Sequence, residues 1–328
     1  MMFWKLSKKC APKRILVVSM TNIGDVVLTC PAIDILREGF PQATMDIVVG
    51  PKAVSLFKEN PHFGLKVFNK QGSLKEKKAF FLELTRGGYD CVVDFRKTAL
   101  SFFLFPRFAT PVITLRQDSE LRHKKGIHLN RLRQVYDFDA ISGERYAVLP
   151  TKEDERFFEV ELSPFLKGKN FVVIAPGAAS SDKRWSPAGF AAVADHLSAA
   201  LKVVFVGDSG DVDIVAGIQS RMKAVSFSLA GKTDLRQLAF ILQRCSWAIT
   251  HDSGVMHLAS YFNVPLVALW GPTSLEKYAP WTSKFVVVRR NEECPRCQSP
   301  KSILAHNCMS FIKVDDVIKS VVELQKCI

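Results

Sequence analysis

The chain has 328 residues, of which 48% are hydrophobic and 23% are charged, a balance typical of globular proteins and a length sufficient for two domains. No apolar run reaches the roughly 20 residues that a transmembrane helix needs. The net charge is +13, and it is uneven, because residues 1–150 hold 24 Lys and Arg against 14 Asp and Glu.

This excess of positive charge indicates an anionic partner for the first half of the chain. Nucleic acid, an anionic membrane surface and a phosphorylated substrate all qualify, and a basic surface that only keeps the protein soluble is the alternative. Lysines interrupt residues 1–10, so we expect no signal-peptide core and a cytosolic protein. Its eight cysteines are then expected to be thiols or metal ligands rather than disulfides.

Apolar runs and helical patterns alternate along the first half of the chain. Strands are expected at residues 14–20, 44–49, 65–68, 89–95 and 112–115, and helices at 26–37, 53–58 and 75–86. A strand, a helix and a second strand in this order indicate a parallel sheet. The aromatic run 102–108 is either a buried helix or an exposed apolar patch, and burial is the expected fate of its phenylalanines.

The same alternation restarts after residues 150–168, a polar stretch that we interpret as a linker. Strands are expected at 170–177, 202–207, 224–229, 245–249 and 264–270, and helices at 186–200, 212–222, 234–244, 259–262 and 314–326. Two such arrays predict an α/β protein with two doubly wound, Rossmann-like domains that face one another across a cleft. Ligands in such sheets bind at the C-terminal ends of the strands.

The loop at residues 250–259 lies between a predicted strand and a predicted helix. Its free backbone N–H groups and the positive end of the helix dipole are typical of a phosphate site. The carboxylate of Asp252 would repel phosphate, so we expect it to accept hydrogen bonds from sugar hydroxyls, and His257 is expected to reach the anion. An ordinary Asp-Ser N-cap is the alternative interpretation.

Two further turns at predicted strand ends carry charged residues. Asp25 follows the first strand and is a candidate general base, with an N-cap as the alternative. In the loop 176–185, small residues such as Gly177 let the backbone approach a ligand. Lys183 and Arg184 in the same loop supply positive charge for a diphosphate. A solvated basic loop is the alternative. The dinucleotide and P-loop glycine patterns are absent, and the turn 206–211 is interpreted as structural.

Cys294 and Cys297 form a CxxC pair, with His306 and Cys308 close behind. This spacing is typical of zinc ligands, and one interpretation is a structural zinc held by Cys294, Cys297 and Cys308. Unrelated thiols in a surface loop are the alternative.

Taken together, residues 20–32, 182–187, 251–259 and 269–273 resemble, in that order, the motifs of the lipopolysaccharide heptosyltransferases of glycosyltransferase family 9. The resemblance covers almost the whole chain, and the cysteine cluster is more similar to the second heptosyltransferase than to the first. It implies a GT-B fold, with residues 1–158 binding the acceptor and residues 159–311 binding a nucleotide sugar. It also implies that the C-terminal helix, residues 312–328, packs back on the first domain.

The resemblance implies an inverting transfer, without a catalytic metal or cofactor, from a nucleotide sugar that is expected to be ADP-heptose. Asp25 matches the family's proposed base, Lys183 the residue that neutralises the leaving diphosphate, and Asp252 the carboxylate that holds the donor sugar. The residues that match the phosphate-cradling loop are Ser253, Gly254 and His257.

The implied acceptor is lipid A–Kdo or the heptosylated inner core, which carries phosphates and carboxylates that suit the basic first half. Residues similar in placement to acceptor-side residues of the family are Arg96, Lys97, His128 and Arg131. We therefore expect a cytoplasmic protein, peripheral on the inner membrane, which residues 3–5 and 102–108 are candidates to touch.

Two alternatives remain open on the sequence. A family member could transfer another sugar from a nucleotide donor to surface glycan. A non-catalytic nucleotide- or nucleic-acid-binding protein would also explain the basic half, but its basic residues show little of the aromatic interleaving that single-strand binders use, so no nucleic-acid partner is expected.

Overall fold

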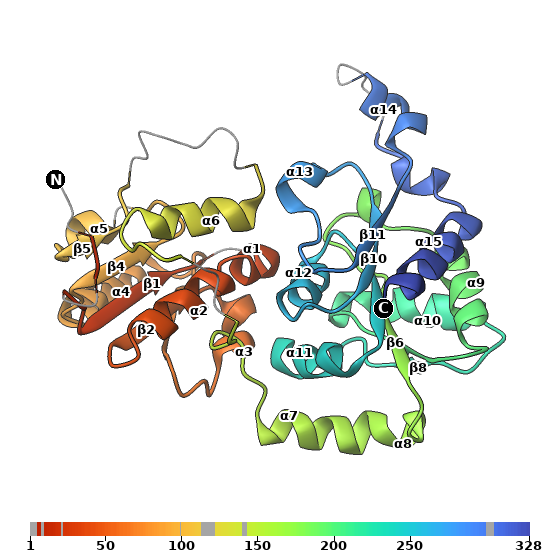
Figure 1. Cartoon of the computed structure of the whole chain (residues 1–328), viewed down its shortest axis with the longest axis horizontal. Coiled ribbons are helices and arrows are strands. Elements are labelled where there is room, and N and C mark those ends of the chain that lie inside the picture. The colour runs from red at the N-terminus through yellow and green to blue at the C-terminus, as the bar shows by residue number, and fades with distance from the viewer. Residues whose placement is uncertain are drawn as a thin grey trace. The chain divides into compact units, whose positions relative to one another are not determined.

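The computed structural model describes residues 5–7, 10–20, 22–98, 100–112, 122–139, 143–299 and 305–328. The chain forms two compact units, which divide between Leu149 and Pro150 rather than at residue 158. Each unit is an α/β body with its own parallel sheet (Figure 1), as the alternation of strands and helices predicts. Among the described residues, no helix is both long and apolar enough to cross a bilayer.

Unit 1 is built on a five-stranded parallel sheet in the order β3-β2-β1-β4-β5. Its strands are β1 (Arg14–Val18), β2 (Thr44–Val49), β3 (Gly64–Val67), β4 (Cys91–Asp94) and β5 (Phe108–Ala109). The first strand lies in the middle and is apolar on both faces, as a doubly covered strand must be. The last strand comes before the expected 112–115, of which residues 113–115 lie outside the described residues.

In unit 1, the single helix expected at residues 26–37 is divided between two helices, α1 (Ile23–Val27) and α2 (Cys30–Gly39). The other helices of this unit are η1 (Pro51–Ala53), α3 (Val54–Phe57), α4 (Leu74–Arg86), α5 (Leu100–Phe103) and α6 (Lys124–Arg133). The helix expected at 26–37 is broken at Thr29, whose hydroxyl donates to the Val26 carbonyl at 2.7 Å. Pro31, which has no N–H group, then lies in the first turn of α2, where a helix tolerates it.

The aromatic run 102–108 is mostly exposed, so the expectation of burial is wrong for three of its phenylalanines. The exposed fractions of Phe102, Phe103 and Phe105 are 61%, 53% and 71%, whereas Phe108 in β5 is buried. Phe102 packs edge-on against Phe103, and Phe103 packs against Phe81 of α4. The three rings therefore form an apolar patch on the surface of unit 1, which we call the phenylalanine patch.

Unit 2 contains a six-stranded parallel sheet in the order β11-β10-β9-β6-β7-β8. Its strands are β6 (Phe171–Ala175), β7 (Lys202–Phe205), β8 (Phe227–Ser228), β9 (Trp247–His251), β10 (Leu266–Trp270) and β11 (Phe285–Arg289). The edge strand β11 was not expected from the sequence. It pairs with β10 over its whole length.

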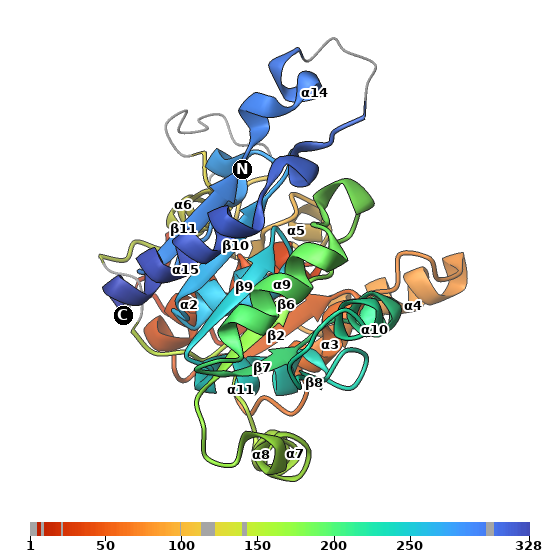
Figure 2. The same cartoon turned by 90° about the vertical axis from the view of Figure 1, so that its right-hand side faces the viewer.

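Helices cover both faces of this sheet (Figures 1 and 2). The longer ones are α9 (Pro187–Leu197), α10 (Val212–Gln219), α11 (Leu235–Arg244), α12 (Gly254–Tyr261) and α15 (Val314–Cys327), and the short elements are η3 (Ser181–Lys183), η4 (Ser209–Asp211), α13 (Leu275–Tyr278), η5 (Asn291–Glu293), α14 (Pro295–Gln298) and η6 (Cys308–Phe311). Val172 and Ile174 of β6 pack with α9, α10 and α15, whereas the intervening Val173 is buried outside that cluster. This period of two is the mark of a strand covered on both faces.

Most of residues 150–168 are helical, from Lys152 to Leu166, so the linker interpretation is wrong. They form α7 (Lys152–Phe157), a π-helical turn η2 (Phe158–Leu162) and α8 (Ser163–Leu166). The side chain of Asp154 caps the first turn by accepting from the backbone N–H and hydroxyl of Thr151. Phe158 packs against Phe171 of β6 and Phe240 of α11, so this segment belongs to unit 2.

The C-terminal helix α15 packs within unit 2. Its packing on the first domain stays a prediction. The helix contacts β10, β11 and α9. Its buried residues Val317, Val321 and Leu324 join the same core as β6 and α9. The amphipathic pattern of α15 predicts a buried face but does not identify the surface that covers it.

Candidate active site

Three loops of unit 2 leave neighbouring strands at the same edge of the sheet. Strand β9 pairs in parallel with both β6 and β10, so the carboxyl ends of all three strands lie side by side. The loops that follow β6, β9 and β10 carry Gly177, Asp252 and Gly271, respectively. This edge is where open parallel sheets bind ligands.

Lys183 and Asp252, which are 69 positions apart in the chain, form an ion pair at this edge. The Lys183 Nζ atom donates to Asp252 Oδ2 at 2.9 Å, with exposed side-chain fractions of 25% and 8%. The Nε2 atom of His257 lies 3.9 Å from the other oxygen of Asp252. The structure thus brings three predicted donor-site residues together, and it pairs the lysine with a carboxylate that the sequence analysis placed beside the sugar.

The N-terminus of α12 lies next to this pair. Ser253 is the N-cap residue, but its side chain makes no capping hydrogen bond, and its Oγ atom has no hydrogen-bond partner among the described residues. The first backbone N–H groups of a helix lack intrahelical acceptors, and the helix dipole favours negative charge there. Ser253 and Gly254 therefore form a site where an anionic oxygen can be bound.

His251 holds the loops of β6 and β9 together, a role that the sequence analysis missed. It is fully buried, its Nε2 accepts from the backbone N–H of Trp185 at 3.0 Å, and its Nδ1 lies 3.3 Å from the Gly177 carbonyl. Burial is the main cause that lowers the pKa of His251 to about 4, although the Gly177 carbonyl acts in the opposite direction. The neutral ring with Nδ1–H and a bare Nε2 satisfies both contacts.

The low pKa of His251 predicts a loss of stability in acid. The unfolded chain binds a proton near pH 6.5 and the folded chain only near pH 4, so the free energy of unfolding should fall as the pH falls through this window. The expected loss is roughly 3 kcal/mol for this residue. The free energy of unfolding can be measured with urea at several pH values. It should change less with pH in His251→Gln than in His196→Gln, a control at an exposed position on α9. An equal change with pH in the two variants would contradict the assignment.

Gly177 is required by a close contact with Asp211. A Cβ atom at Gly177 would lie 2.1 Å from Asp211 Oδ2, so any side chain there would displace this carboxylate. Asp211 accepts from the backbone N–H of Asp208 at 3.1 Å, and burial raises its pKa. The turn 206–211, which was interpreted as structural, thus supports the loop of Gly177.

Asp25 lies in unit 1, in the loop and short helix that follow β1. It is half-buried in the first turn of α1, and Asn22 is the N-cap residue, so Asp25 is not the cap itself. The preceding Thr21 lies outside the described residues. A carboxylate in the first turn is favoured by the helix dipole.

The four candidate acceptor residues follow β4 or belong to α6. Arg96 and Lys97 are exposed, in a turn that the carboxylate of Asp94 closes by accepting from the Arg96 N–H at 2.7 Å. Arg131 is buried and donates to the carbonyls of Asp94 and Pro111. Burial, with nearby positive charge, lowers the pKa of His128 to about 3. Arg131 and His128 therefore support the turn, whereas the side chains of Arg96 and Lys97 are exposed to solvent.

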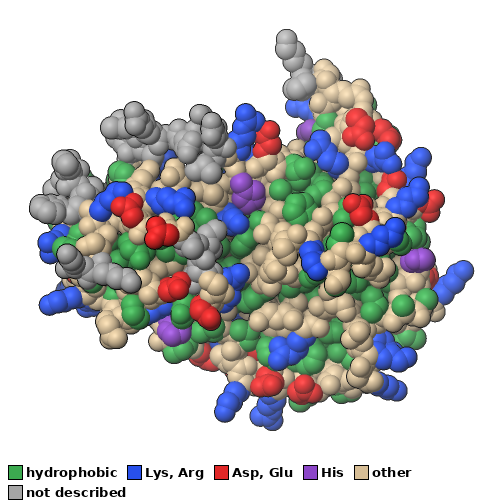
Figure 3. All heavy atoms as spheres, viewed as in Figure 1, with side chains coloured by type: hydrophobic (Ala, Val, Ile, Leu, Met, Phe, Trp, Pro, Cys, Tyr) green, Lys and Arg blue, Asp and Glu red, His purple; other side chains and the backbone are tan. Residues whose placement is uncertain are grey.

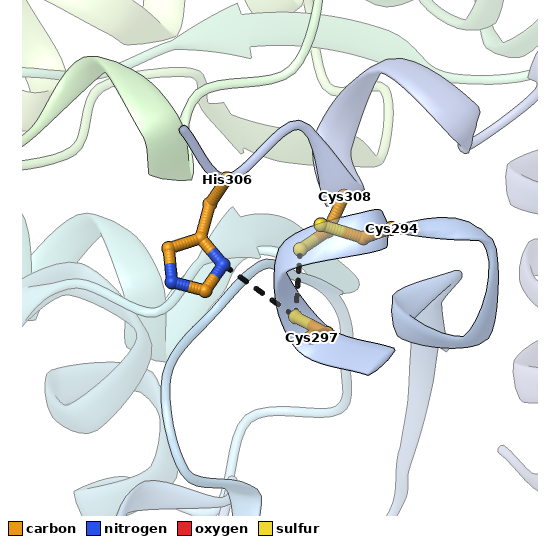
Figure 4. A group of neighbouring side chains, drawn as sticks. All are labelled: Cys294, Cys297, His306 and Cys308. Atoms are coloured by element: carbon orange, nitrogen blue, oxygen red, sulfur yellow. Dashed lines mark hydrogen bonds between the residues drawn. The ribbon is translucent and has the colours of Figure 1, made fainter. Parts of the chain in front are cut away.

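Cys294, Cys297, His306 and Cys308 come together in unit 2, with their ligand atoms within 4.8 Å of one another (Figure 4). His306 adds a fourth residue to the three predicted cysteines. Burial raises the pKa of the Cys294 thiol, but backbone hydrogen bonds around Asn307 and Cys297 outweigh it and lower that pKa to about 6.

On the face shown in Figure 3, Lys and Arg side chains are spread over the surface and interspersed with Asp and Glu. Among the described residues on this face, the Lys and Arg side chains do not form a single continuous stripe. A continuous basic stripe is what a nucleic-acid backbone needs.

Two α/β units, each with its own parallel sheet, are the fold of the GT-B glycosyltransferases. The sequence model of glycosyltransferase family 9 (heptosyltransferase) matches residues 79–307. The chain therefore belongs to glycosyltransferase family 9, and it is a glycosyltransferase.

Individual relatives agree with this assignment. The chain is 26% identical to lipooligosaccharide heptosyltransferase 2 of Campylobacter jejuni, over 93% of this chain and 96% of the relative. A family 9 glycosyltransferase from Veillonella parvula superposes with a TM-score of 0.79 at 26% identity, over 96% and 98% of the two chains. The Escherichia coli heptosyltransferase WaaC with ADP-2-deoxy-2-fluoro heptose shares the fold, with a TM-score of 0.66 at 15% identity over 94% and 99%. These similarities support a heptosyltransferase of lipopolysaccharide core synthesis.

Proposed function

We propose that the protein transfers heptose from ADP-heptose to the inner core of lipopolysaccharide, with inversion at the anomeric carbon. The observation that carries the proposal is the Lys183–Asp252 pair beside the N-terminus of α12. This arrangement offers a cation and helix N–H groups to a diphosphate, and a carboxylate to sugar hydroxyls. The related structure solved with an ADP-heptose analogue supports the choice of donor.

The donor diphosphate would bind at Ser253 and Gly254 and recruit Lys183. In the structure, Lys183 is neutralised by Asp252 at 2.9 Å, so the diphosphate and Asp252 compete for the same ammonium group. Once Lys183 turns to the diphosphate, the oxygens of Asp252 are available to the sugar hydroxyls. As the bond to the anomeric carbon breaks, the lysine stabilises the charge that develops on ADP, the task that a metal ion has in other transferases.

Asp25 would act as the general base. It would take the proton of an acceptor hydroxyl while that oxygen attacks the anomeric carbon from the face opposite the diphosphate, which inverts the configuration. Because Asp25 belongs to unit 1 and the donor residues belong to unit 2, the proposed reaction needs both units. It needs no cofactor.

The proposed acceptor is lipid A–Kdo or the heptosylated core, bound by unit 1. Arg96 and Lys97 are exposed and can pair with phosphate or carboxylate groups of the acceptor. Arg131 and His128 would act indirectly, by holding the turn that carries Arg96 and Lys97. The acceptor is part of a lipid, so we also propose that unit 1 binds the cytoplasmic face of the inner membrane.

The phenylalanine patch supports this membrane contact and predicts a measurable effect. Replacing Phe102, Phe103 and Phe105 together by serine should weaken binding to anionic phospholipid vesicles at least about tenfold, as measured by co-sedimentation. Each ring that enters the membrane contributes more than about 1 kcal/mol to the binding free energy. Val225→Ser, which changes an exposed apolar residue of unit 2, should leave binding unchanged. Equal binding by the triple variant would exclude the patch as the contact.

Product analysis by mass spectrometry, with purified ADP-heptose and truncated core acceptors, tests the proposed function directly. The expected result is an acceptor heavier by one heptose. Calorimetric titration with ADP- and UDP-sugars separates the sugar alternatives, since tight binding of a UDP-sugar and none of an ADP-sugar would refute the heptose assignment. Salt-sensitive nanomolar DNA binding, without transfer, would favour the nucleic-acid alternative instead.

A further inference from the structure

We propose that Cys294, Cys297, His306 and Cys308 bind one structural zinc ion, which fastens η5, α14 and η6 to unit 2. The four side chains point toward a common centre (Figure 4), and each offers one ligand atom. Three thiols and one imidazole form a closed Cys₃His set, which is the composition of structural rather than catalytic zinc sites. On binding, each thiol that still carries a proton would release it to solvent, and the imidazole would bind as the neutral ring.

The distances in the cluster fit a tetrahedral ion. Zinc bonds of about 2.3 Å to sulfur and 2.0–2.1 Å to nitrogen, at tetrahedral angles, place a sulfur and a nitrogen ligand about 3.5 Å apart and two sulfurs about 3.8 Å apart. The Cys297 Sγ atom lies 3.5 Å from His306 Nδ1 and 3.3 Å from Cys308 Sγ. All four ligand atoms lie within 4.8 Å of one another, so movements of about 1 Å or less complete the tetrahedron.

The described helices on the N-terminal side of the cluster are short. The helix α14 has four residues and η5 has three, lengths that are not stable in isolation. Cys294 and Cys308 are fully buried, and Cys297 is brought beside them by the turn in which its N–H donates to the Cys294 carbonyl. A metal ion supplies the stability that such a short, weakly apolar segment lacks.

A disulfide accounts for the cluster less well. The Sγ atoms of Cys297 and Cys308 are 3.3 Å apart, well beyond the roughly 2.05 Å of a bonded pair. A disulfide would also use only two of three adjacent thiols and would give no role to His306.

The zinc centre is connected to the donor site through η6, which contains Cys308 and contacts both β10 and η3, the element of Lys183. Trp185, which follows this lysine, donates from its indole Nε1 to the Ile312 carbonyl at 2.9 Å. Cys297 and His306 also line a cavity of about 700 Å³ next to the turn Pro272–Ser274 that follows β10. The ion would therefore position the Lys183 loop, an effect that rests on the proposed function.

Metal analysis of the purified full-length protein tests the site. We expect about one zinc per chain in the wild type and in Cys327→Ser, an exposed control on α15, and a loss of zinc in Cys297→Ser. Replacing the zinc with Co²⁺ should give the intense thiolate-to-cobalt absorption of a tetrahedral site, altered in His306→Ala. A metal-free wild type, iron in place of zinc, or a Cys297–Cys308 disulfide found by peptide mass spectrometry would each overturn the proposal.

A kinetic measurement tests the connection to the donor site. Loss of the ion in Cys297→Ser should lower the melting temperature and raise KM for ADP-heptose several-fold, with a smaller change in kcat. Unchanged kinetics in a zinc-free variant would overturn the positioning effect. The zinc content and the melting temperature are measured without the sugar donor. A zinc-loaded protein that transfers no heptose would therefore refute the proposed function but not the proposed zinc site.

Discussion

Asp25→Asn should abolish heptosyl transfer while leaving the affinity for ADP-heptose nearly unchanged. The amide has almost the same shape as the carboxylate but does not accept the proton of the acceptor hydroxyl. General-base catalysis contributes about 10²–10⁴-fold, so kcat should fall by that factor. Asp25 lies in the first turn of α1 in unit 1, and the donor residues lie in unit 2, so donor binding should survive.

The measurement combines steady-state kinetics with calorimetric titration of the donor. Glu38→Gln removes a carboxylate from an exposed position in the same unit and serves as the matched control. It should behave like the wild type in both experiments. Turnover of Asp25→Asn at the wild-type rate would exclude Asp25 as the base, and loss of donor binding would indicate a structural role instead.

Lys183→Ala should weaken both donor binding and turnover, because the ammonium group would contact the diphosphate before and during the reaction. Removing one such electrostatic group from a transition state costs about 10²–10³-fold in rate. The exposed Lys169→Ala of unit 2 is the control for a general loss of positive charge. Wild-type kcat/KM in Lys183→Ala would contradict the role of this lysine.

A double variant separates this catalytic loss from a loss of stability. Lys183→Ala alone leaves the carboxylate of Asp252, of which 8% is exposed, without its partner at 2.9 Å. The expected destabilisation is about 1–3 kcal/mol. Adding Asp252→Asn removes the unpaired charge, so urea unfolding should recover most of the stability while transfer remains lost.

Much of the fold follows from local patterns in the sequence. The apolar runs of β1, β2 and β6 are buried on both faces, and their length and flanking turns identify them without any tertiary information. The strand β11 was missed although Val286, Val287 and Val288 give a clear signal. The helix α7 was missed because its charges were interpreted as those of a linker, although the Thr151–Asp154 capping box and the buried Phe158 and Leu162 were available.

Other features depend on tertiary contacts that local patterns do not contain. The phenylalanines of the patch are as apolar as those of a core, and only the absence of a covering element among the described residues makes them exposed. The Lys183–Asp252 pair joins residues from two loops, and it depends on β6 and β9 being neighbours. The fourth cluster residue, His306, likewise meets Cys297 only through the folding of the intervening chain.

The placement of α15 has a consequence for how unit 2 folds during synthesis. Strand β6 can pair with β7 early, but β9 and then β10 and β11 join the sheet only as later residues emerge. Val317, Val321 and Leu324 cover the apolar face last, so the core stays open to solvent until the final helix has been made. Parallel sheets with such distant contacts fold slowly, and an uncovered apolar face favours aggregation. We therefore expect the nascent chain to stay prone to aggregation until α15 has been made and has covered this face.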